Sequence, residues 1–361
     1  MTPRERWLAA VRMKQVDRLP FWPKIGNAYR RAQAAPFRDL TTEELHGWFG
    51  SDRHEWLSNC VEETRKHTSV ESTTAGGVMR TVYRTPTGTL DTVHQFDASS
   101  DSWHPVKFPV STREEIKRMS AVYEDVSVSL NSDALREAEE QARTMGETAI
   151  TATSVGTSPL MDWIQAVAGT EQGHLLLADY PDEVSALFSA MHRVMQDRAN
   201  LLAVDHPADL LYVVENTSTT LISPHQYRAH CRKHIIDYAA ATRQTGRCLV
   251  LHMCGHLRAL LPDLAGIPAH AFEAFTSPPV GNTSLLDGRT ACPDRCLIGG
   301  TNAVLWTQPA GTIIRQIEQD LDVLPHHRGV VVTSAGVMPP ACRPETIREV
   351  GEWVRGYQVR A

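Results

Sequence analysis

The sequence predicts an α/β fold, a single (β/α)8 TIM barrel that spans residues 1–361, and two observations carry this prediction. From about residue 110 onward, short apolar segments alternate with amphipathic helical segments, which is the pattern of a parallel sheet covered on both faces. No linker or low-complexity stretch divides the chain, so many βα units in succession favour a closed barrel. An open doubly wound sheet is the alternative, but no Gly-x-Gly-x-x-Gly follows a predicted strand.

The N-terminal part predicts two additions to the barrel. Thr2 and Glu5 form a capping box with Pro3 at the first helical position, so a helical extension begins the chain. Residues 19–22 then read as a short strand. Residues 78–98 predict a β-hairpin insertion that turns at residues 86–88.

The later elements follow one another regularly. Helix 181–204 is the clearest, because its apolar residues recur at three- and four-residue spacing. The other helices are predicted at 112–120, 132–145, from 223 onward, 255–263, 311–322 and 344–357. The later strands are predicted at 148–154, 210–214, 248–252, 270–275, 296–300 and 329–334.

Composition excludes several classes of function. The chain is 42% hydrophobic and 22% charged with a net charge of −6, and it has no basic stretch that would favour nucleic-acid binding. No apolar run reaches the roughly 18 residues of a membrane span. The charged N-terminus lacks a signal-peptide core, which predicts a cytoplasmic protein. Seven cysteines, an odd number, argue against a disulfide framework and leave thiols free for metal binding or catalysis.

His252 and Cys254 form the sharpest local pattern. They lie two residues apart at the end of an apolar strand, so their side chains point the same way. In a parallel barrel, the carboxyl ends of the strands carry the active site. A nitrogen and sulfur pair suits zinc.

Two further strand ends supply candidate ligands. Glu273 is a charged residue inside the apolar strand 270–275, where a buried carboxylate needs a partner such as a cation. Cys342 follows the last predicted strand. The alternative interpretation is structural, since a cysteine at a strand end is commonly a small buried apolar residue and a core histidine is commonly an inert hydrogen-bonded one.

These residues resemble the uroporphyrinogen decarboxylase superfamily, and within it the zinc-dependent, corrinoid-linked methyltransferases. The resemblance covers nearly the whole chain. Residues 2–6 and 16–20 are similar to the family's start, and Glu215-Asn216-Thr217-Ser218 is similar to its middle. The family's His-x-Cys…Cys metal motif falls on His252, Cys254 and Cys342. Cobalamin-independent methionine synthase has a similar layout with an intervening glutamate, which corresponds best to Glu273.

The decarboxylase branch fits less well. Its Arg-Gln-Ala-Gly-Arg segment after the first strand is absent, although Lys24, Arg30 and Arg31 keep this region basic. The resemblance therefore implies methyl transfer between a small methylated substrate or thiol and a corrinoid. The nearest string to the corrinoid-binding Asp-x-His-x-x-Gly, residues 52–57, ends in Leu57, so methylcobalamin would arrive on a separate protein. Methyl ethers, as in O-demethylation, are among the open substrates, and a homodimer is among the assemblies that the resemblance allows.

The resemblance also implies roles for individual residues. Zn2+ would be bound by His252, Cys254, Glu273 and Cys342, with Glu273 as the catalytic, exchangeable ligand. Other candidates come from position in the sequence and not from the resemblance: Glu215 and Asn216 follow a strand and could bind substrate, or alternatively belong to a helix-capping loop. Trp22 is a candidate pocket wall, with core packing as its alternative.

Two rival functions remain open at this point. One is a metal-free decarboxylase or lyase that acts on a small carboxylate, with His252 as its acid–base group. The other is a non-catalytic subunit that docks to a corrinoid protein.

Overall fold

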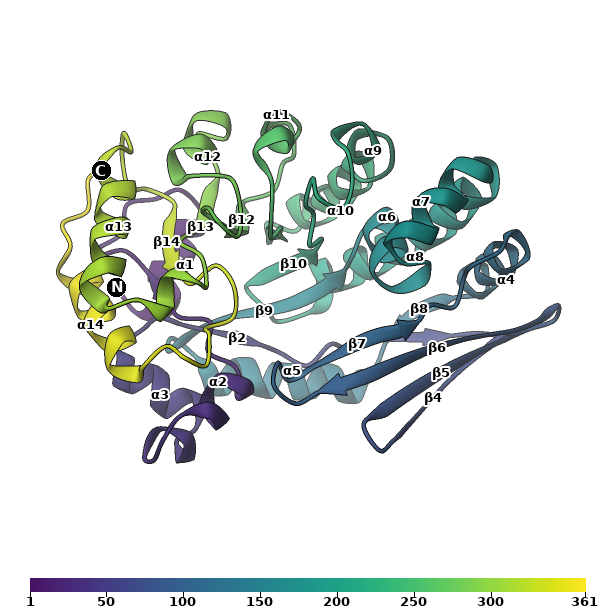
Figure 1. Cartoon of the computed structure of the whole chain (residues 1–361), viewed down its shortest axis with the longest axis horizontal. Coiled ribbons are helices and arrows are strands. Elements are labelled where there is room, and N and C mark those ends of the chain that lie inside the picture. Colours follow the sequence, from purple (N-terminus) through teal and green to yellow (C-terminus); the bar gives the residue numbers. More distant parts are fainter.

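The computed structural model describes residues 1–361, and its centre is a parallel sheet of eight strands that curves into a nearly closed barrel (Figure 1). The strand order predicted for a (β/α)8 barrel is confirmed: neighbouring strands follow one another around the sheet. In spatial order the strands are β1 (Phe21–Trp22), β14 (Val330–Thr333), β13 (Cys296–Gly300), β12 (Ala271–Phe275), β11 (Cys248–His252), β10 (Leu210–Val214), β9 (Ala149–Gly156) and β2 (Arg53–Trp56).

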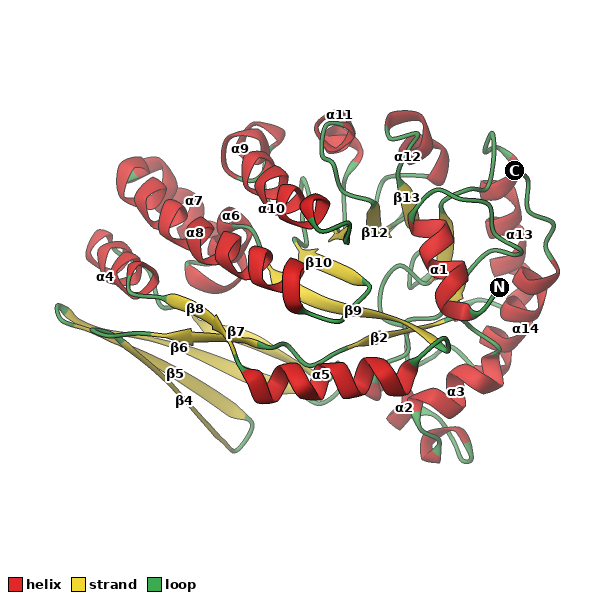
Figure 2. Ribbon diagram, turned by 180° about the vertical axis from the view of Figure 1, so that it is seen from behind, coloured by secondary structure: helices red, strands yellow, loops and turns green.

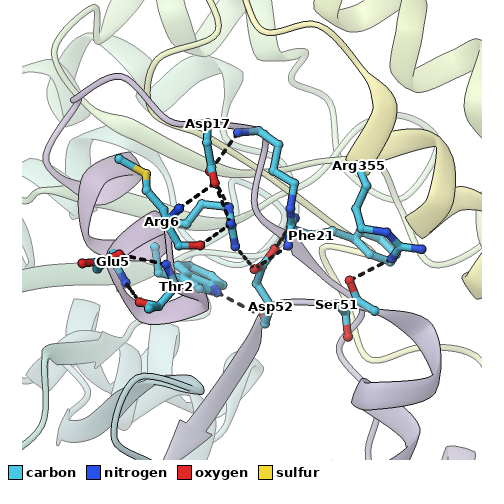
Figure 3. Close-up of polar contacts among 12 residues, drawn as sticks. Thr2, Glu5, Arg6, Asp17, Phe21, Ser51, Asp52 and Arg355 are labelled. Carbon is cyan, nitrogen blue, oxygen red and sulfur yellow. Dashed lines mark hydrogen bonds and ion pairs between the residues drawn. The ribbon is translucent and has the colours of Figure 1, made fainter.

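The seam between β1 and β2 is closed by one residue rather than by a strand ladder. The backbone N–H of Asp52 donates to the carbonyl of Phe21 at 2.7 Å, and the N–H of Phe21 donates to the Asp52 carboxylate at 3.0 Å. Arg6 and Arg18 also bind this fully buried carboxylate. Figure 3 shows Asp52 between Phe21 and Arg6, with Asp17 on the far side of Arg6.

Helices cover the outside of the barrel (Figure 2). The N-terminal helix has the predicted capping box of Thr2 and Glu5. The α-helices are α1 (Pro3–Val11), α2 (Asn27–Ala32), α3 (Thr42–Phe49), α4 (Arg113–Glu124), α5 (Ser132–Met145), α6 (Pro159–Asp162), α7 (Thr170–Asp179), α8 (Pro181–Asp205), α9 (Pro224–His230), α10 (Arg232–Gln244), α11 (Leu261–Ala265), α12 (Leu285–Ala291), α13 (Ala310–Asp322) and α14 (Pro344–Gly356). The short helical turns are η1 (Phe37–Asp39), η2 (Trp163–Val167), η3 (Arg258–Leu260) and η4 (Leu305–Thr307). No helix is long and apolar enough to cross a membrane.

An antiparallel sheet extends away from the barrel, on the right of Figure 1. It contains β4 (Ser69–Ala75), β5 (Val78–Thr85), β6 (Gly88–Asp97) and β7 (Ser102–Lys107), in that order. The predicted hairpin is its central pair, β5 and β6, and two further strands flank it. A separate antiparallel pair, β3 (Val61–Thr64) with β8 (Ser127–Leu130), connects this region to the barrel.

Two apolar cores hold the barrel. The larger lies between the sheet and the surrounding helices, where each strand turns alternate residues outward. The smaller fills the barrel itself and includes Trp7, Trp22 and Tyr212. The barrel interior is therefore packed with side chains and is not an open pore.

The structure differs from the sequence prediction at two places near that mouth. The strand β2 was not predicted, because its residues Arg53-His54-Glu55-Trp56 are mostly polar. The helix predicted at 255–263 begins later, because residues 253–257 form a loop and the short η3 and α11 follow from residue 258. This loop carries Cys254.

Candidate active site at the barrel mouth

His252 and Glu273 lie side by side at the barrel mouth. They end or nearly end the adjacent strands β11 and β12, where His252 is the register partner of Glu273. The ring nitrogen Nδ1 of His252 is hydrogen-bonded to Oε2 of Glu273. The second carboxylate oxygen, Oε1, accepts a hydrogen bond of 2.7 Å from Nζ of Lys24. Glu273 thus stands between two basic groups, and its side chain is only 2% exposed.

Lys24 reaches Glu273 from the loop after β1. The backbone carbonyl of Lys24 accepts a hydrogen bond from the N–H of Met338, and its own N–H donates to the Ser334 hydroxyl. The loop after the last strand, β14, therefore fixes the position of this lysine. The sequence marks Lys24 only as part of a basic region, and its partner lies 249 residues away.

The electrostatics of this group follow from burial and charge. Burial alone would raise the pKa of Glu273, but the positive charges of Lys24 and His252 outweigh it and lower the pKa to about 2. Burial would lower the pKa of His252, but the Glu273 carboxylate outweighs it and raises the pKa to about 9. In this arrangement Glu273 is ionised and His252 is protonated at neutral pH.

Cys254 lies beside the His252–Glu273 pair in the loop after β11. Its thiol donates to the side-chain oxygen of Asn216 at 3.5 Å, and the thiol is half-buried. The Asn216 amide in turn donates to Gln165 at 2.7 Å. Asn216 has a left-handed backbone with φ of 49°, a strained conformation of the kind that gathers at functional sites.

The loop that presents Cys254 depends on a glycine. Gly255 has a φ of 113°, and a Cβ added there would lie 2.7 Å from the Ser218 hydroxyl oxygen. That hydroxyl accepts a hydrogen bond from the N–H of His256 at 3.0 Å. The close approach of the two loops therefore requires the absence of a side chain at residue 255.

Glu215, a predicted substrate-binding residue, is fully buried. Its two carboxylate oxygens accept hydrogen bonds of 2.6 and 2.7 Å from the N–H and hydroxyl of Ser158. Burial raises the pKa of Glu215 to about 7. Its contacts join the ends of β9 and β10, whereas its neighbour Asn216 faces the Cys254 thiol.

Aromatic side chains border the same mouth. His54 stacks on Trp22 with ring centroids 4.4 Å apart and is hydrogen-bonded to the Tyr212 hydroxyl at 3.1 Å. Trp56, at the end of β2, packs edge-on against Tyr212 and His54. Trp22, Lys24, His54 and Trp56 all line one cavity of about 330 Å3. Trp22 is a predicted pocket residue, whereas His54 and Trp56 are not predicted from the sequence, because β2 has no apolar strand pattern.

Cys342, the predicted fourth metal ligand, is packed in the larger apolar core and is 1% exposed. The hydrogen bond of its thiol is to the Arg343 carbonyl, at 3.8 Å. Burial raises the pKa of this thiol to about 12. The loop that carries it packs against α2, where the Gln33 side chain donates to the Pro340 carbonyl at 3.0 Å.

The residues therefore supply the donor types that zinc prefers without gathering them around one point. No group of three or more His, Cys, Asp or Glu side chains is placed to hold a metal ion. Both oxygens of Glu273 already have partners, Lys24 and His252. The buried carboxylate thus has the positive partners that its burial requires.

Comparison with solved structures confirms the barrel architecture. A methyltransferase from Methanosarcina mazei is similar over 99% of this chain and 98% of its own, with a TM-score of 0.62 and 15% sequence identity. A B12-independent methionine synthase from a Shewanella species is similar over 71% of this chain and 72% of its own, with a TM-score of 0.47 and 11% identity. At these identities the likeness concerns the fold alone. No curated protein has detectable sequence similarity to the chain.

Sequence comparison gives a family. Residues 101–357 match the family described as uroporphyrinogen decarboxylase (URO-D). The matched range begins near the end of the antiparallel sheet and runs through β14 and α14, so it includes His252, Cys254, Glu273 and Cys342. The chain belongs to the uroporphyrinogen decarboxylase family.

Proposed function

We propose that the protein is a zinc-dependent methyltransferase that moves a methyl group between a small methylated substrate or thiol and a corrinoid carried on a separate protein. The observation that carries the proposal is that His252 and Glu273 are hydrogen-bonded across adjacent strand ends at the barrel mouth, with Cys254 two residues beyond His252 in the following loop. A thiol, an imidazole and a carboxylate are the side chains that bind zinc in proteins. Membership of the URO-D family and the fold shared with a methyltransferase support the same conclusion.

The proposed ligands are His252, Cys254 and Cys342, with Glu273 as an exchangeable fourth. Zinc held by thiolates would be a weak Lewis acid, and a substrate sulfur or oxygen bound to it would stay electron-rich. The side chains as described do not form this site, since Cys342 is packed in the core and Glu273 is already hydrogen-bonded. The proposal therefore rests on the type and location of the donors.

The chain's own residues have definite tasks in this site. Lys24 keeps the Glu273 carboxylate ionised, and Glu273 orients the His252 ring through Nδ1. Asn216 accepts the hydrogen bond of the Cys254 thiol and so restrains the position of the sulfur. Together these contacts hold an acidic, a basic and a sulfur-bearing group around the same opening.

Zinc stoichiometry tests the proposal directly. The wild type is expected to contain about one zinc ion per chain, and Cys254→Ser and Cys342→Ser are expected to lower zinc affinity at least tenfold. Cys60→Ser is the matched control, because Cys60 is a buried free thiol outside the mouth. Each preparation is then mixed with methylcobalamin and a thiol, and loss of the methyl–cobalt absorbance is followed. A wild type without zinc and without methyl transfer would refute the proposal.

One observation favours a second candidate, a metal-free decarboxylase or lyase that acts on a small carboxylate. The buried Glu273 carboxylate has two positive partners, Lys24 and His252, without a metal. This arrangement leaves a protonated imidazole at the mouth. Such an imidazolium could donate a proton to a carbanion. This candidate predicts that extensive dialysis against a chelator leaves turnover unchanged, and that His252→Gln abolishes it.

A further inference from the structure

The cavity beside the Lys24–Glu273 pair has the features of a substrate site. Its volume of about 330 Å3 is at the lower end of the range for small-molecule sites. That volume accommodates a single substituted ring and is too small for a tetrapyrrole. The cavity lies between the ends of β1 and β2, and its wall includes Lys24, the residue that binds Glu273.

Trp56 is an unusually exposed residue in the wall of this cavity. Its side chain is 51% exposed although it is one of the largest apolar groups in the protein. The ring is held by edge-on contacts with Tyr212, at 4.9 Å between centroids, and with His54, at 5.4 Å. An exposed indole that is fixed by two other rings offers a preformed surface for stacking, because little side-chain entropy is lost when a ligand covers it.

Lys24 supplies a positive charge in the wall of the same cavity. Its ammonium group has three N–H donors, and its one hydrogen bond to another side chain is the 2.7 Å bond to Glu273. The ammonium lies 5.2 Å from the centre of the Trp22 ring, which also lines the cavity. The remaining donors are suited to an anionic oxygen on a ligand.

The other polar groups of the wall are not competing cations. His46 and His54 are both buried, and burial lowers the pKa of His46 to about 3 and of His54 to about 4, so both rings are neutral. Glu55 is already paired with Arg53 at 3.2 Å. His54 also has a ring nitrogen, Nδ1, without a hydrogen-bond partner. Lys24 is therefore the cation that an anionic ligand would meet.

We propose that this cavity binds the substrate, and that the substrate is a planar aromatic molecule carrying an anionic oxygen. The ring stacks on Trp56 and the oxygen binds Lys24, whose ammonium is hydrogen-bonded to Glu273. This assignment rests on the methyltransferase function proposed above, for which it narrows the small methylated substrate to an aromatic one.

Binding of unmethylated probes to the full-length protein tests this assignment. In isothermal titration calorimetry, benzoate is expected to bind about three- to tenfold more tightly than cyclohexanecarboxylate, which has the same charge but no π-face. Benzamide, which is aromatic but neutral, is expected to bind at least tenfold more weakly than benzoate. Equal affinities for benzoate and cyclohexanecarboxylate would overturn the assignment.

Variants locate the site. Trp56→Leu is expected to remove the preference for benzoate, and Trp56→Phe to keep most of it. Trp103→Leu is the matched control, because Trp103 is also exposed but lies on the antiparallel sheet. A loss of affinity in Trp103→Leu as large as in Trp56→Leu would contradict the proposal.

Zinc analysis of the same preparations separates this inference from the proposed function. Benzoate binding that depends on Trp56 in a zinc-free protein would support the aromatic site and remove the case for zinc-dependent methyl transfer. A zinc-containing protein without a preference for benzoate would overturn the aromatic site and leave methyl transfer intact.

Discussion

Asp52 joins the first and second strands of the barrel through Phe21, with a backbone hydrogen bond of 2.7 Å in one direction and a side-chain hydrogen bond of 3.0 Å in the other. The same carboxylate forms ion pairs with both Arg6 and Arg18. One acidic residue, Asp52, therefore takes the place of the strand-to-strand hydrogen bonds that would otherwise close the sheet between β1 and β2. Its side chain is fully buried.

Replacing this carboxylate is expected to be costly. Asp52→Asn keeps the shape but leaves the Arg6 and Arg18 charges without a buried partner, so we expect it to lower the free energy of unfolding by about 3–5 kcal/mol. The measurement is urea-induced unfolding followed by circular dichroism. Asp17→Asn is the control, because Asp17 also binds Arg6 but is 41% exposed, and it should cost less than about 1 kcal/mol. Similar losses in the two variants would contradict this account of the seam.

The pair of Lys24 and Glu273 can be tested by a double-mutant cycle. Lys24→Met leaves a buried carboxylate with His252 as its remaining partner, and we expect a loss of about 3 kcal/mol in unfolding free energy at pH 7. The double variant Lys24→Met/Glu273→Gln should lose less than the sum of the two single variants, because removal of the charge removes the need for its partner. Strict additivity would mean that the two side chains do not interact.

Gly255 is expected to be intolerant of any side chain. Gly255→Ala would place a Cβ at 2.7 Å from the Ser218 oxygen in a backbone conformation that L-residues rarely adopt, and we expect a loss of about 1–3 kcal/mol together with lower zinc affinity. Gly47→Ala is the matched control, because Gly47 lies in α3 with no atom within 4 Å of the added Cβ. That variant should be neutral or stabilised by up to about 1 kcal/mol, and a comparable loss there would show that glycine replacement is harmful in general.

Asp162 gives a pH-dependent prediction away from the mouth. Burial raises its pKa from 3.8 to about 6, against the lowering effect of a hydrogen bond from Tyr123. The native state therefore binds a proton more tightly than the unfolded state, and this contribution to stability is complete below about pH 4 and lost as the pH rises through 6. Asp162→Asn should be more stable than the wild type at pH 7.5, by up to about 3 kcal/mol, and similar to it near pH 4.

The measurement is the urea midpoint of both proteins at the two pH values. Asp133→Asn, at an exposed position in α5, should change the midpoint little at either pH. A stabilisation of Asp162→Asn that is the same at both pH values would contradict the role of ionisation.

The sequence predicted the barrel because most of its strands are buried on both faces and are therefore continuously apolar, as in 210–214 and 248–252. It did not predict β2, because Arg53 and His54 are buried polar residues whose partners, Glu43 and Tyr212, are set by the fold. The outer strands β4 and β7 were missed for the opposite reason. They are largely exposed, so no alternation of apolar and polar residues marks them.

The site was predictable to the extent that strand register determines it. His252 and Glu273 meet because neighbouring parallel strands end together. The partnership of Lys24 with Glu273 depends instead on loops after β1 and β14, and no local pattern encodes it. The position of Cys342 also depends on such a loop, so its role as a zinc ligand stays a prediction.

The two-residue strand β1 pairs with β14, so that Phe21 faces Val332 and Trp22 faces Thr333. Ladder contacts between residues more than 300 positions apart are slow to form, because the intervening chain must first be ordered. During synthesis β1 has no partner on this side until residues 330–333 have left the ribosome. A chain that is truncated or stalled before β14 would therefore leave β1 without this partner. The unpaired edge of β1 could then pair with strands of other proteins.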